Sequence, residues 1–364
     1  MEEIKMEIPT KTVMPTMRDI LTVAFERNAS DIHITVGVPP KMRVVGHLIA
    51  MDFPRLMPED TYMLAKQVMS DAQFEKFEST GEHDMSVAMD GLGRYRLNVF
   101  MQRGSVAMSL RSVGDKIPSA ESLGVPISVA NLYQRKRGLV LVTGPTGSGK
   151  STTLASIIDL INTNRDCHVI TLEEPIEYLH NHKLSTINQR EIGLDTASFA
   201  NGLRAALRED PDVILVGERR DFETISTAIT AAETGHLVFS TLHTVDAAST
   251  IDRVIDVFPP HQQQQIRVQL ANVLEAVIAQ TLLPTINEDR RVAAFEVLHA
   301  NHAVRNLIRE GKTHQIPSIM QTNKSMGMQT MDDCLLDLYM RRLISKDNCI
   351  KFARDPDAMQ SKLM

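Results

Sequence analysis

The sequence has few aromatic residues, few cysteines and no long apolar run. Tryptophan is absent and aromatic residues make up only 4% of the 364 residues, which leaves little surface on which nucleic-acid bases could stack. The three cysteines, Cys167, Cys334 and Cys349, lie far apart and form no CxxC pair, so we expect neither a disulfide framework nor a zinc ribbon. No apolar run approaches the roughly 18 residues that are needed to span a bilayer.

Positive charge is not in excess either. The chain has 39 Lys and Arg against 45 Asp and Glu, a formal net charge of -6, which provides no overall attraction to a phosphate backbone or an anionic membrane. We therefore predict no nucleic-acid partner. The start of the chain, MEEIKMEIPT, is acidic and lacks the apolar core of a signal peptide, so we expect a cytoplasmic protein.

The pattern of apolar residues divides the chain into four parts. Residues 1–114 mix helix and strand signals, including a helix from Pro58 to Phe77 and a strand pair from Arg94 to Val113, and they are predicted to form an α+β domain. Residues 115–137 are predicted to be a linker with a short helix, and residues 301–364 a helical region. In residues 138–300 apolar strands alternate with amphipathic helices, which predicts an α/β fold with a parallel sheet covered on both faces. The expected strands are LVLVTG, HVITLEE, DVILVGE, HLVFSTLH and RVAAFEVLH.

The segment Gly144-Pro-Thr-Gly-Ser-Gly-Lys150-Ser151 matches the phosphate-loop pattern G-x-x-x-x-G-K-[ST], with a strand before it and a helix after it. These flanks argue against a glycine-rich turn that arose by chance. Backbone N–H groups of such a loop point at phosphate oxygens, Lys150 supplies charge for the β- and γ-phosphates, and the Ser151 hydroxyl is placed to coordinate Mg²⁺. We predict that ATP and Mg²⁺ bind here. The predicted nucleotide contacts are Thr146, Gly147, Ser148, Gly149, Lys150, Ser151 and Thr152.

Carboxylates follow two of the expected strands. In parallel sheets the carboxyl ends of the strands line the ligand crevice, so Glu218, which ends DVILVGE, is predicted to polarise the attacking water or to hold Mg²⁺. A solvated residue at a strand end is the alternative. Glu174 and Glu177 lie with Glu173 in LEEPIEY, and so many neighbouring carboxylates favour a metal-nucleotide site over an acidic surface turn.

Two histidines bracket the strand in TGHLVFSTLHT. A strand of this length covers roughly 23 Å, so His236 and His243 cannot contact the same phosphate. His243 lies at the carboxyl end and is predicted to sense the γ-phosphate. His236 is assigned either to a subunit boundary or to a structural capping role.

A hairpin in the first domain gathers arginines on one face. A two-residue turn at Arg103-Gly104 pairs Arg96 with Arg111 and places Arg94 on the same face. Like charges opposite each other are unfavourable, which suggests that an anion lies between them. Well-solvated arginines on an open face are the alternative. The predicted apolar face of the hairpin consists of Tyr95, Leu97, Val99, Met101, Val106, Met108 and Leu110.

In their order and spacing, the phosphate loop, TLEEPIEY, DPDVILVGERRD and TAAETGHLVFSTLHT closely resemble the motifs of the secretion and pilus-motor ATPases. The segment ASDIHITVGVPPKMRVVGHL resembles the PAS-like N-terminal domain of that family, so the resemblance covers nearly the whole chain. It implies a RecA-like P-loop ATPase core that follows a PAS-like domain. It also implies that Arg94, Arg96 and Arg111 contact a nucleotide held at the boundary with a neighbouring subunit.

The segment AVRNLIREGKTHQI resembles a motif of the retraction branch of the same family. The resemblance then implies a homo-hexameric motor that hydrolyses ATP to power type IV pilus retraction and twitching motility. The implied partner is the inner-membrane platform protein of the pilus machine, with the motor bound peripherally at the cytoplasmic face. Arg219 and Phe222 stand where Met and Leu are usual, which indicates a divergent branch or a paralogue.

Three other functions fit parts of the sequence. One is a pilus assembly or type II secretion ATPase, although those chains usually have a longer N-terminal region and a tetracysteine zinc motif. Another is a nucleic-acid motor with a RecA-like core, which the acidic charge disfavours. The third is a regulatory protein that binds nucleotide without turnover, which the presence of Lys150, Glu218 and His243 disfavours.

Overall fold

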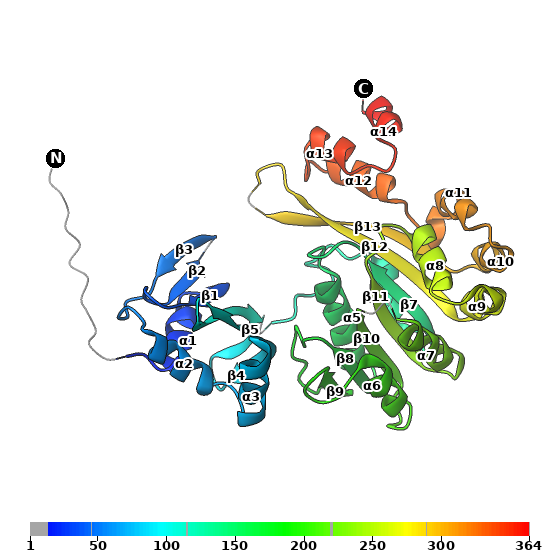
Figure 1. Cartoon of the computed structure of the whole chain (residues 1–364). Coiled ribbons are helices and arrows are strands. Elements are labelled where there is room, and N and C mark those ends of the chain that lie inside the picture. Colours follow the sequence, from blue (N-terminus) through cyan, green and yellow to red (C-terminus); the bar gives the residue numbers. More distant parts are fainter. Residues whose placement is uncertain (1–13, 45, 114–115, 219–220, 289, 364) are drawn as a thin grey trace, which may run out of the picture. The chain divides into compact units, whose positions relative to one another are not determined.

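The computed structural model describes residues 14–44, 46–113, 116–218, 221–288 and 290–363, with Glu218 described by its backbone alone. The chain divides into two compact units, Met1–Lys116 and Ile117–Met364. Figure 1 shows the helices and strands of each unit. The finer division at residues 115–137 and 301 stays a prediction. No helix in the described ranges is both long enough and apolar enough to cross a membrane.

The first unit is a six-stranded antiparallel sheet in the order β3-β2-β1-β6-β5-β4. Its strands are β1 (Asp31–Ile34), β2 (Lys41–Val44), β3 (His47–Ala50), β4 (Glu82–Met89), β5 (Gly93–Gln102) and β6 (Ser105–Val113). Three helices, α1 (Met17–Glu26), α2 (Pro58–Lys66) and α3 (Asp71–Thr80), accompany the sheet. Apolar side chains from α1, α2, α3 and the sheet form one buried core.

The single helix expected from Pro58 to Phe77 is wrong, because the structure has two helices there. Ser70 has an extended backbone and caps α3, since its hydroxyl accepts a hydrogen bond from the Gln73 N–H while the Gln73 side chain binds back to Ser70. This reciprocal capping stabilises a new helix start. The continuous apolar period of the segment does not reveal the interruption.

The register predicted for the β5–β6 hairpin is confirmed. Arg96 pairs with Arg111 and Gln102 with Ser105, and the turn residues Arg103 and Gly104 have φ values of 49° and 76°, as a tight hairpin turn requires. The predicted apolar face is buried except at one position. Met101, next to the turn, is 47% exposed, so this end of the apolar face lies outside the core.

The second unit contains a seven-stranded sheet in the order β13-β12-β7-β11-β10-β8-β9. Its strands are β7 (Gly138–Thr143), β8 (His168–Glu173), β9 (Thr186–Glu191), β10 (Val213–Glu218), β11 (Leu237–Leu242), β12 (Leu274–Pro284) and β13 (Arg291–His299). The strands from β12 to β9 are parallel and only β13 is antiparallel to its neighbour. The predicted α/β class is therefore confirmed.

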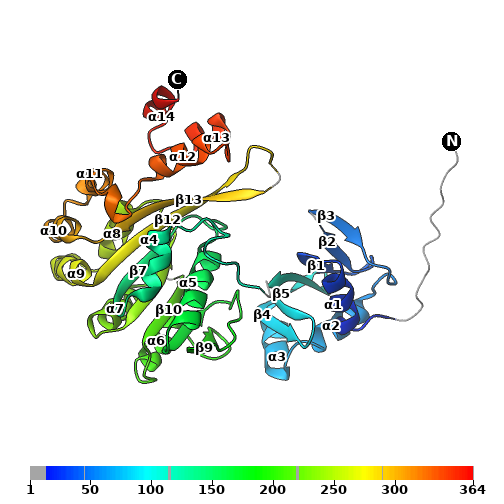
Figure 2. The same ribbon diagram turned by 180° about the vertical axis from the view of Figure 1, so that it is seen from behind.

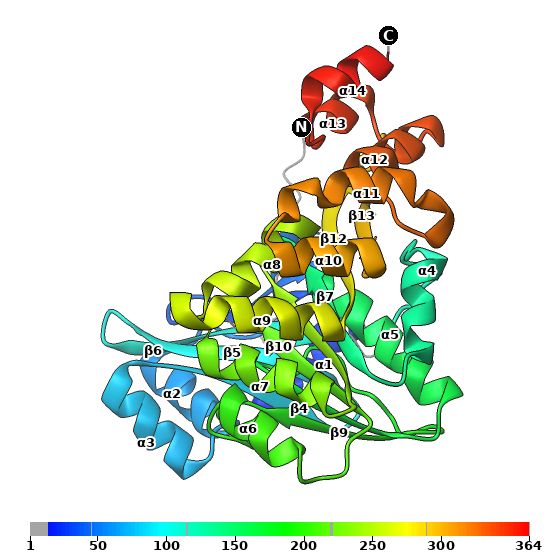
Figure 3. The ribbon, with the colours of Figure 1, turned by 90° about the vertical axis from the view of Figure 1, so that its right-hand side faces the viewer.

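Helices cover both faces of this sheet. One face packs against α6 (Phe199–Ala206), α7 (Phe222–Glu233), α8 (Ala247–Asp256), α9 (Pro260–Val273), α10 (His302–Glu310) and α11 (Ile316–Thr322), and several of these lie toward the viewer in Figure 3. The other face packs against α4 (Ile127–Ala130), the 3₁₀ turn η1 (Asn131–Gln134) and α5 (Lys150–Asn164), as Figure 2 shows. Alternate residues of β7 enter the two cores, which explains why this strand is apolar throughout.

Two strands, β9 and β12, were not among those expected. The segment that forms β12 contains helix-favouring Leu, Glu, Ala and Gln residues, so local preference does not indicate a strand. Its position between β7 and β13 decides its conformation.

The end of the chain is helical, as expected, and packs on the β12–β13 hairpin (Figure 1). It consists of α12 (Met331–Met340), α13 (Lys346–Lys351) and α14 (Pro356–Lys362), preceded by the 3₁₀ turns η2 (Thr313–Gln315) and η3 (Lys324–Met326). Apolar residues of β12, β13 and these last three helices form a separate small core.

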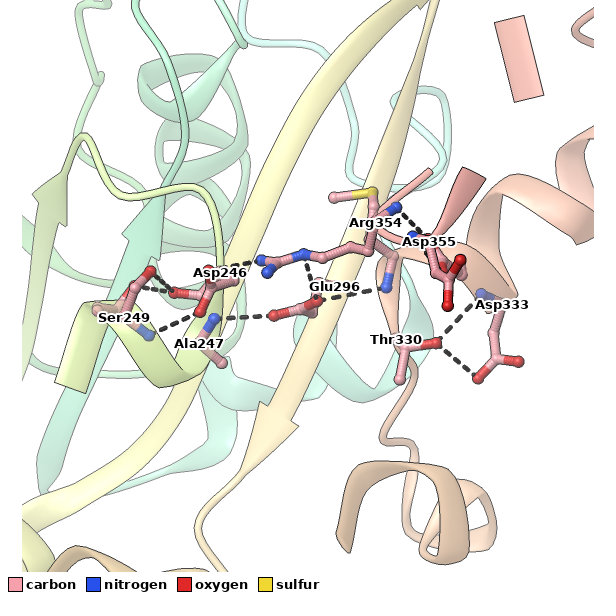
Figure 4. Close-up of polar contacts among 11 residues, drawn as sticks. Asp246, Ala247, Ser249, Glu296, Thr330, Asp333, Arg354 and Asp355 are labelled. Atoms are coloured by element: carbon pink, nitrogen blue, oxygen red, sulfur yellow. Dashed lines mark hydrogen bonds and ion pairs between the residues drawn. The ribbon is translucent and has the colours of Figure 1, made fainter. Parts of the chain in front are cut away.

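Polar contacts join these helices to the rest of the unit (Figure 4). Glu296 of β13 is 6% exposed and accepts hydrogen bonds from the Ala247 N–H at 2.8 Å and the Met331 N–H at 3.4 Å. It thereby links the start of α8 to the start of α12. Burial raises the pKa of Glu296, although these backbone hydrogen bonds act in the opposite direction.

Candidate functional site

A cavity of about 410 Å³ lies at the carboxyl ends of the parallel strands in the second unit. Its walls come from the loop between β7 and α5, the ends of β8, β10 and β11, and the β12–β13 hairpin. It is lined by Thr146, Gly147, Gly149, Lys150, Ser151, Thr152, Leu154, Ala155, Thr171, Glu173, Glu174, Pro175, Glu177, Tyr178, His180, Leu215, Gly217, Thr241, His243, Leu282 and Arg291.

The loop between β7 and α5 has the conformation that its glycines permit. Gly144, Gly147 and Gly149 have φ values of 142°, 78° and 87°, a region that residues with a Cβ rarely adopt. The helix α5 begins directly at Lys150, and residues of its first turn line the cavity, so the partial positive charge of its N-terminus faces the cavity. This arrangement suits an anion such as a phosphate group.

The Lys150 side chain is 8% exposed. Its ammonium donates hydrogen bonds to the carbonyl oxygens of Gly144 at 2.9 Å and Pro145 at 3.2 Å. These bonds hold the charge against the loop, beside the positions that phosphate oxygens take in a loop of this type.

The remaining predicted loop residues do not all face the cavity. Thr146, Gly147, Gly149, Ser151 and Thr152 line it, and the Thr152 hydroxyl lies 3.0 Å from the Tyr178 hydroxyl. Ser148 is 3% exposed and is not part of the lining. Its contribution to the loop is a backbone hydrogen bond, from its N–H to the Pro145 carbonyl at 3.2 Å.

The three carboxylates after β8 differ in their surroundings. Glu173 is held by hydrogen bonds from the Thr171 hydroxyl at 2.7 Å and the Gln189 amide at 3.1 Å. Burial raises the pKa of Glu173, and these hydrogen bonds only partly oppose the shift. Glu174 and Glu177 are exposed and line the cavity, and their role at a metal-nucleotide site stays a prediction.

Glu218 ends β10, and its backbone pairs with Thr241 of β11. Because Gly217 and Thr241 both line the cavity, the backbone of Glu218 lies at this edge of the sheet. The Glu218 side chain and all of Arg219 lie outside the described part of the structure, so the catalytic assignment of Glu218 stays a prediction.

The two histidines lie at opposite ends of β11. His243 lines the cavity. His236 is not part of the lining, and its ring nitrogen Nδ1 lies 2.9 Å from the Ala231 carbonyl and 3.2 Å from the Thr234 hydroxyl. This geometry fits the capping role at the end of α7, and the assignment of His236 to a subunit boundary stays a prediction.

The arginine face of the first unit contains an anion that the sequence analysis missed. Asp31 of β1 pairs with Arg111 in the sheet register, and its carboxylate lies 2.9 Å from the Arg111 guanidinium. Burial acts to raise the pKa of Asp31, but the hydrogen bond and charge of Arg111 hold it below its usual value. Since Asp31 offsets one of the facing charges, the pair does not by itself require a bound anion. The nucleotide role of Arg94, Arg96 and Arg111 stays a prediction.

Several lining residues were not singled out from the sequence. Tyr178 and His180 follow the carboxylates after β8, while Leu282 and Arg291 belong to the β12–β13 hairpin. Burial lowers the pKa of His180 to about 4, so this ring is neutral at physiological pH. Tyr178 ends the segment LEEPIEY and His180 follows shortly after it, so this segment was a possible signal for both, whereas nothing in the sequence placed the hairpin beside the loop.

The chain is similar to known proteins over nearly all its length. Residues 126–346 match the model of the family described as type II/IV secretion system protein. The chain is 46% identical over 339 residues to the type IV pilus retractation ATPase PilT of Pseudomonas aeruginosa, covering 93% of this chain and 98% of that protein. It is 47% identical over 320 residues to a twitching motility protein of Neisseria gonorrhoeae, covering 88% and 86% of the two chains.

A solved structure is also similar. A crystal structure of the pilus retraction motor PilT with bound ADP matches with a TM-score of 0.90 and 52% identity, over 95% of this chain and 99% of that one. The resemblance that the sequence motifs indicated is therefore confirmed.

Proposed function

The chain belongs to the type II/IV secretion system protein family, and on this premise we propose that it is a motor ATPase that powers type IV pilus retraction. The observation that carries the proposal is a complete phosphate loop that forms one wall of a cavity. The other walls of this cavity contain carboxylates and His243. The relatives that match over nearly their whole length are named for pilus retraction and twitching motility.

In the proposed reaction the backbone N–H groups of the loop and the start of α5 hold the phosphates of ATP. Lys150 offsets the charge of the β- and γ-phosphates. Glu218 accepts a proton from the attacking water, and Glu174 and Glu177 act with it at the same edge of the sheet. His243 contacts the γ-phosphate, so the conformation at the end of β11 depends on whether ATP or ADP is bound.

The oxygen donors at this edge suit Mg²⁺, which prefers a few protein oxygens together with phosphate oxygens. Ser151, in the first turn of α5, and Glu218, at the end of β10, would hold the ion. When bound, Mg²⁺ neutralises charge that develops on the phosphates.

The remaining parts of the proposal concern assembly. The motor is a homo-hexamer at the cytoplasmic face of the inner membrane, where it acts on the platform protein of the pilus machine. Arg94, Arg96 and Arg111 of one subunit contact the nucleotide of its neighbour. These statements rest on the family resemblance and on the exposed side chains of Arg96 and Arg111 in the first unit.

A comparison of two variants tests the proposal. Lys150→Ala removes the charge that faces the phosphates and is expected to abolish tight binding of ATP. Glu218→Gln is expected to keep ATP binding but to lower turnover by at least about a hundredfold, the usual effect of removing a catalytic group. Nucleotide affinity and phosphate release are measured for both.

Near-normal hydrolysis by Glu218→Gln would transfer the catalytic assignment to Glu174 or Glu177. Deletion of the gene tests the biological role. Cells that keep their pili but do not twitch support retraction, whereas cells without pili indicate an assembly motor. ATPase activity stimulated by single-stranded DNA would favour a nucleic-acid motor instead.

A further inference from the structure

Gln280 lies in β12, directly beside the start of the phosphate loop. Ala279 of β12 pairs with Thr143, the last residue of β7, and the two strands are parallel. Gln280 is therefore level with Gly144, where the loop begins. It is 3% exposed and continues the alternating row of Ala276 and Ile278, both fully buried in the core beneath α5.

The backbone of Gln280 shapes the beginning of the loop. A Cβ atom placed on Gly144 would lie 2.2 Å from the Gln280 carbonyl oxygen, closer than real Cβ atoms come to any atom. Gly144 also has a φ of 142°, so a side chain there would be strained as well as blocked. The loop therefore leaves β7 pressed against the backbone of Gln280.

The side chain of Gln280 reaches the other end of the loop. Its Oε1 accepts a hydrogen bond from the Thr153 hydroxyl at 2.8 Å, and Thr153 lies in the first turn of α5. Its Nε2 lies 3.0 Å from the position of a Cβ on Gly149, the residue before α5. One residue of a neighbouring strand thus touches both the beginning and the end of the phosphate loop.

A buried amide in an apolar row is costly unless it is hydrogen-bonded. An apolar residue would fill the same volume without that cost, so packing alone does not explain a glutamine here. We propose that Gln280 is a positioning residue of the ATPase site, which fixes Gly149 and Thr153 so that the loop N–H groups converge on the phosphates. Gln280 does not line the cavity and acts on nucleotide only through the loop.

This inference rests on the proposed binding of nucleotide in the cavity, and binding of MgADP is the test. Gln280→Met keeps the length of the side chain but removes both polar atoms. We expect it to raise the Kd for ADP and to lower kcat/KM for ATP, each by about tenfold or more, the usual effect of losing one such polar contact.

The matched control is Gln329→Met in the same unit. Gln329 is partly buried, and its amide donates a hydrogen bond to the Phe295 carbonyl at 2.7 Å, away from the cavity lining. If Gln280 contributed only to packing, both variants would have a lower Tm, and the Kd for ADP would be the same in the two variants. A loss of positioning changes the Kd only in Gln280→Met.

Two further variants keep the test valid if Gln280→Met does not fold. Thr153→Val removes the other half of the hydrogen bond and is expected to weaken ADP binding similarly, with little additional loss in the double variant. Gln280→Glu keeps the acceptor for Thr153 but puts an oxygen in place of Nε2 beside Gly149. It is expected to weaken ATP binding more than ADP binding, because a negative charge under the loop opposes the more highly charged ligand.

The outcomes separate this inference from the proposed function. Wild-type protein that does not bind ADP would overturn both. Wild-type protein that binds ADP, with Kd values within twofold in Gln280→Met and Thr153→Val, would overturn the role of Gln280 alone. Losses that simply add in the double variant would also overturn it, because they would show that the two residues act independently.

Discussion

The guanidinium of Arg354 lies 2.8 Å from the carboxylate of Asp246 and 3.9 Å from that of Glu296. Asp246 caps α8 by accepting a hydrogen bond from the Ser249 N–H, and α8 is the first helix after His243. Arg354 follows α13, and its own N–H donates to Asp332 of α12 at 2.7 Å. These contacts join the C-terminal helices to the segment that leaves the nucleotide cavity (Figure 4).

The first prediction concerns this ion pair. Asp246→Asn removes the charge but preserves the helix cap, and Arg354→Met removes the guanidinium. We expect each change to lower the free energy of unfolding by roughly 1 kcal/mol, since the Arg354 side chain is 40% exposed and solvent weakens the pair. Urea unfolding of both single variants and the double variant gives the coupling energy.

The control for this pair is Arg341→Met. Arg341, the residue that follows α12, pairs with Asp337 of that helix, and both side chains are 63% exposed, so its loss is expected to have little effect. Single effects that add in the Asp246/Arg354 double variant would show that the two residues do not stabilise each other.

The second prediction concerns α10, the helix with the retraction-like motif. Arg305 is bound within the unit, since it pairs with Glu275 at 3.0 Å and donates to the Asn272 carbonyl at the end of α9. Arg305→Ala is therefore expected to lower stability as well as motility. Asn306 is exposed, so Asn306→Ala is expected to block retraction while most ATPase activity remains.

Twitching assays and phosphate release are measured side by side for both α10 variants. Exposed Glu310 on the same helix provides a control in Glu310→Ala. If Asn306→Ala loses hydrolysis in proportion to motility, α10 supports the catalytic fold rather than coupling hydrolysis to retraction.

The third prediction concerns the arginines of the first unit. Arg96→Ala and Arg111→Ala subunits are expected to bind ATP but to hydrolyse it at least about tenfold more slowly, because arginines that act across a subunit boundary stabilise the transition state. Mixing either variant with Glu218→Gln subunits is expected to restore some activity, since a mixed ring contains boundaries at which both groups are intact.

Asp31→Asn is the control for Arg111, because it breaks the ion pair and leaves the guanidinium in place. Equal losses in Asp31→Asn and Arg111→Ala would assign Arg111 a structural role. Fluorescence transfer between labelled subunits establishes that they exchange. Mixed rings that exchange subunits but show no activity above either parent would contradict action across the boundary.

The fourth prediction concerns pH. Burial lowers the pKa of His180 to about 4 in the folded protein, against an ordinary value of about 6.5 in the unfolded chain. Between these values the unfolded chain binds a proton that the folded protein does not. This group therefore lowers stability as the pH falls from about 6.5 to about 4, by up to roughly 3 kcal/mol, and has little effect above pH 7.

The measurement is the difference in unfolding free energy between wild-type protein and His180→Asn at several pH values. Other acidic and basic groups contribute equally to both proteins and cancel. The same substitution at exposed His261 serves as the control. A difference that stays constant between pH 7 and pH 4 would show that His180 takes up its proton as easily in the folded protein as in the unfolded chain.

The sequence by itself determined the chemistry of the phosphate loop and the class of the fold. Glycine spacing, Lys150 and the alternation of apolar strands with helices depend on local geometry, and local geometry can be read from neighbouring residues. The β5–β6 register also followed from the sequence, because a shift by one residue would expose its apolar face. Met101 lies on this face but is exposed, because it is beside the turn at the edge of the core.

Only the tertiary structure decided which distant segments complete the site. Gln280 and Arg291 lie far along the chain from Gly149. Gln280 reaches the loop because β12 is placed beside β7, and Arg291 reaches the cavity because β13 is placed beside β12. Asp31 likewise meets Arg111 only through the pairing of β1 with β6. Such contacts depend on the order of strands in a sheet, and this order is set by packing over the whole unit rather than by the preferences of any one segment.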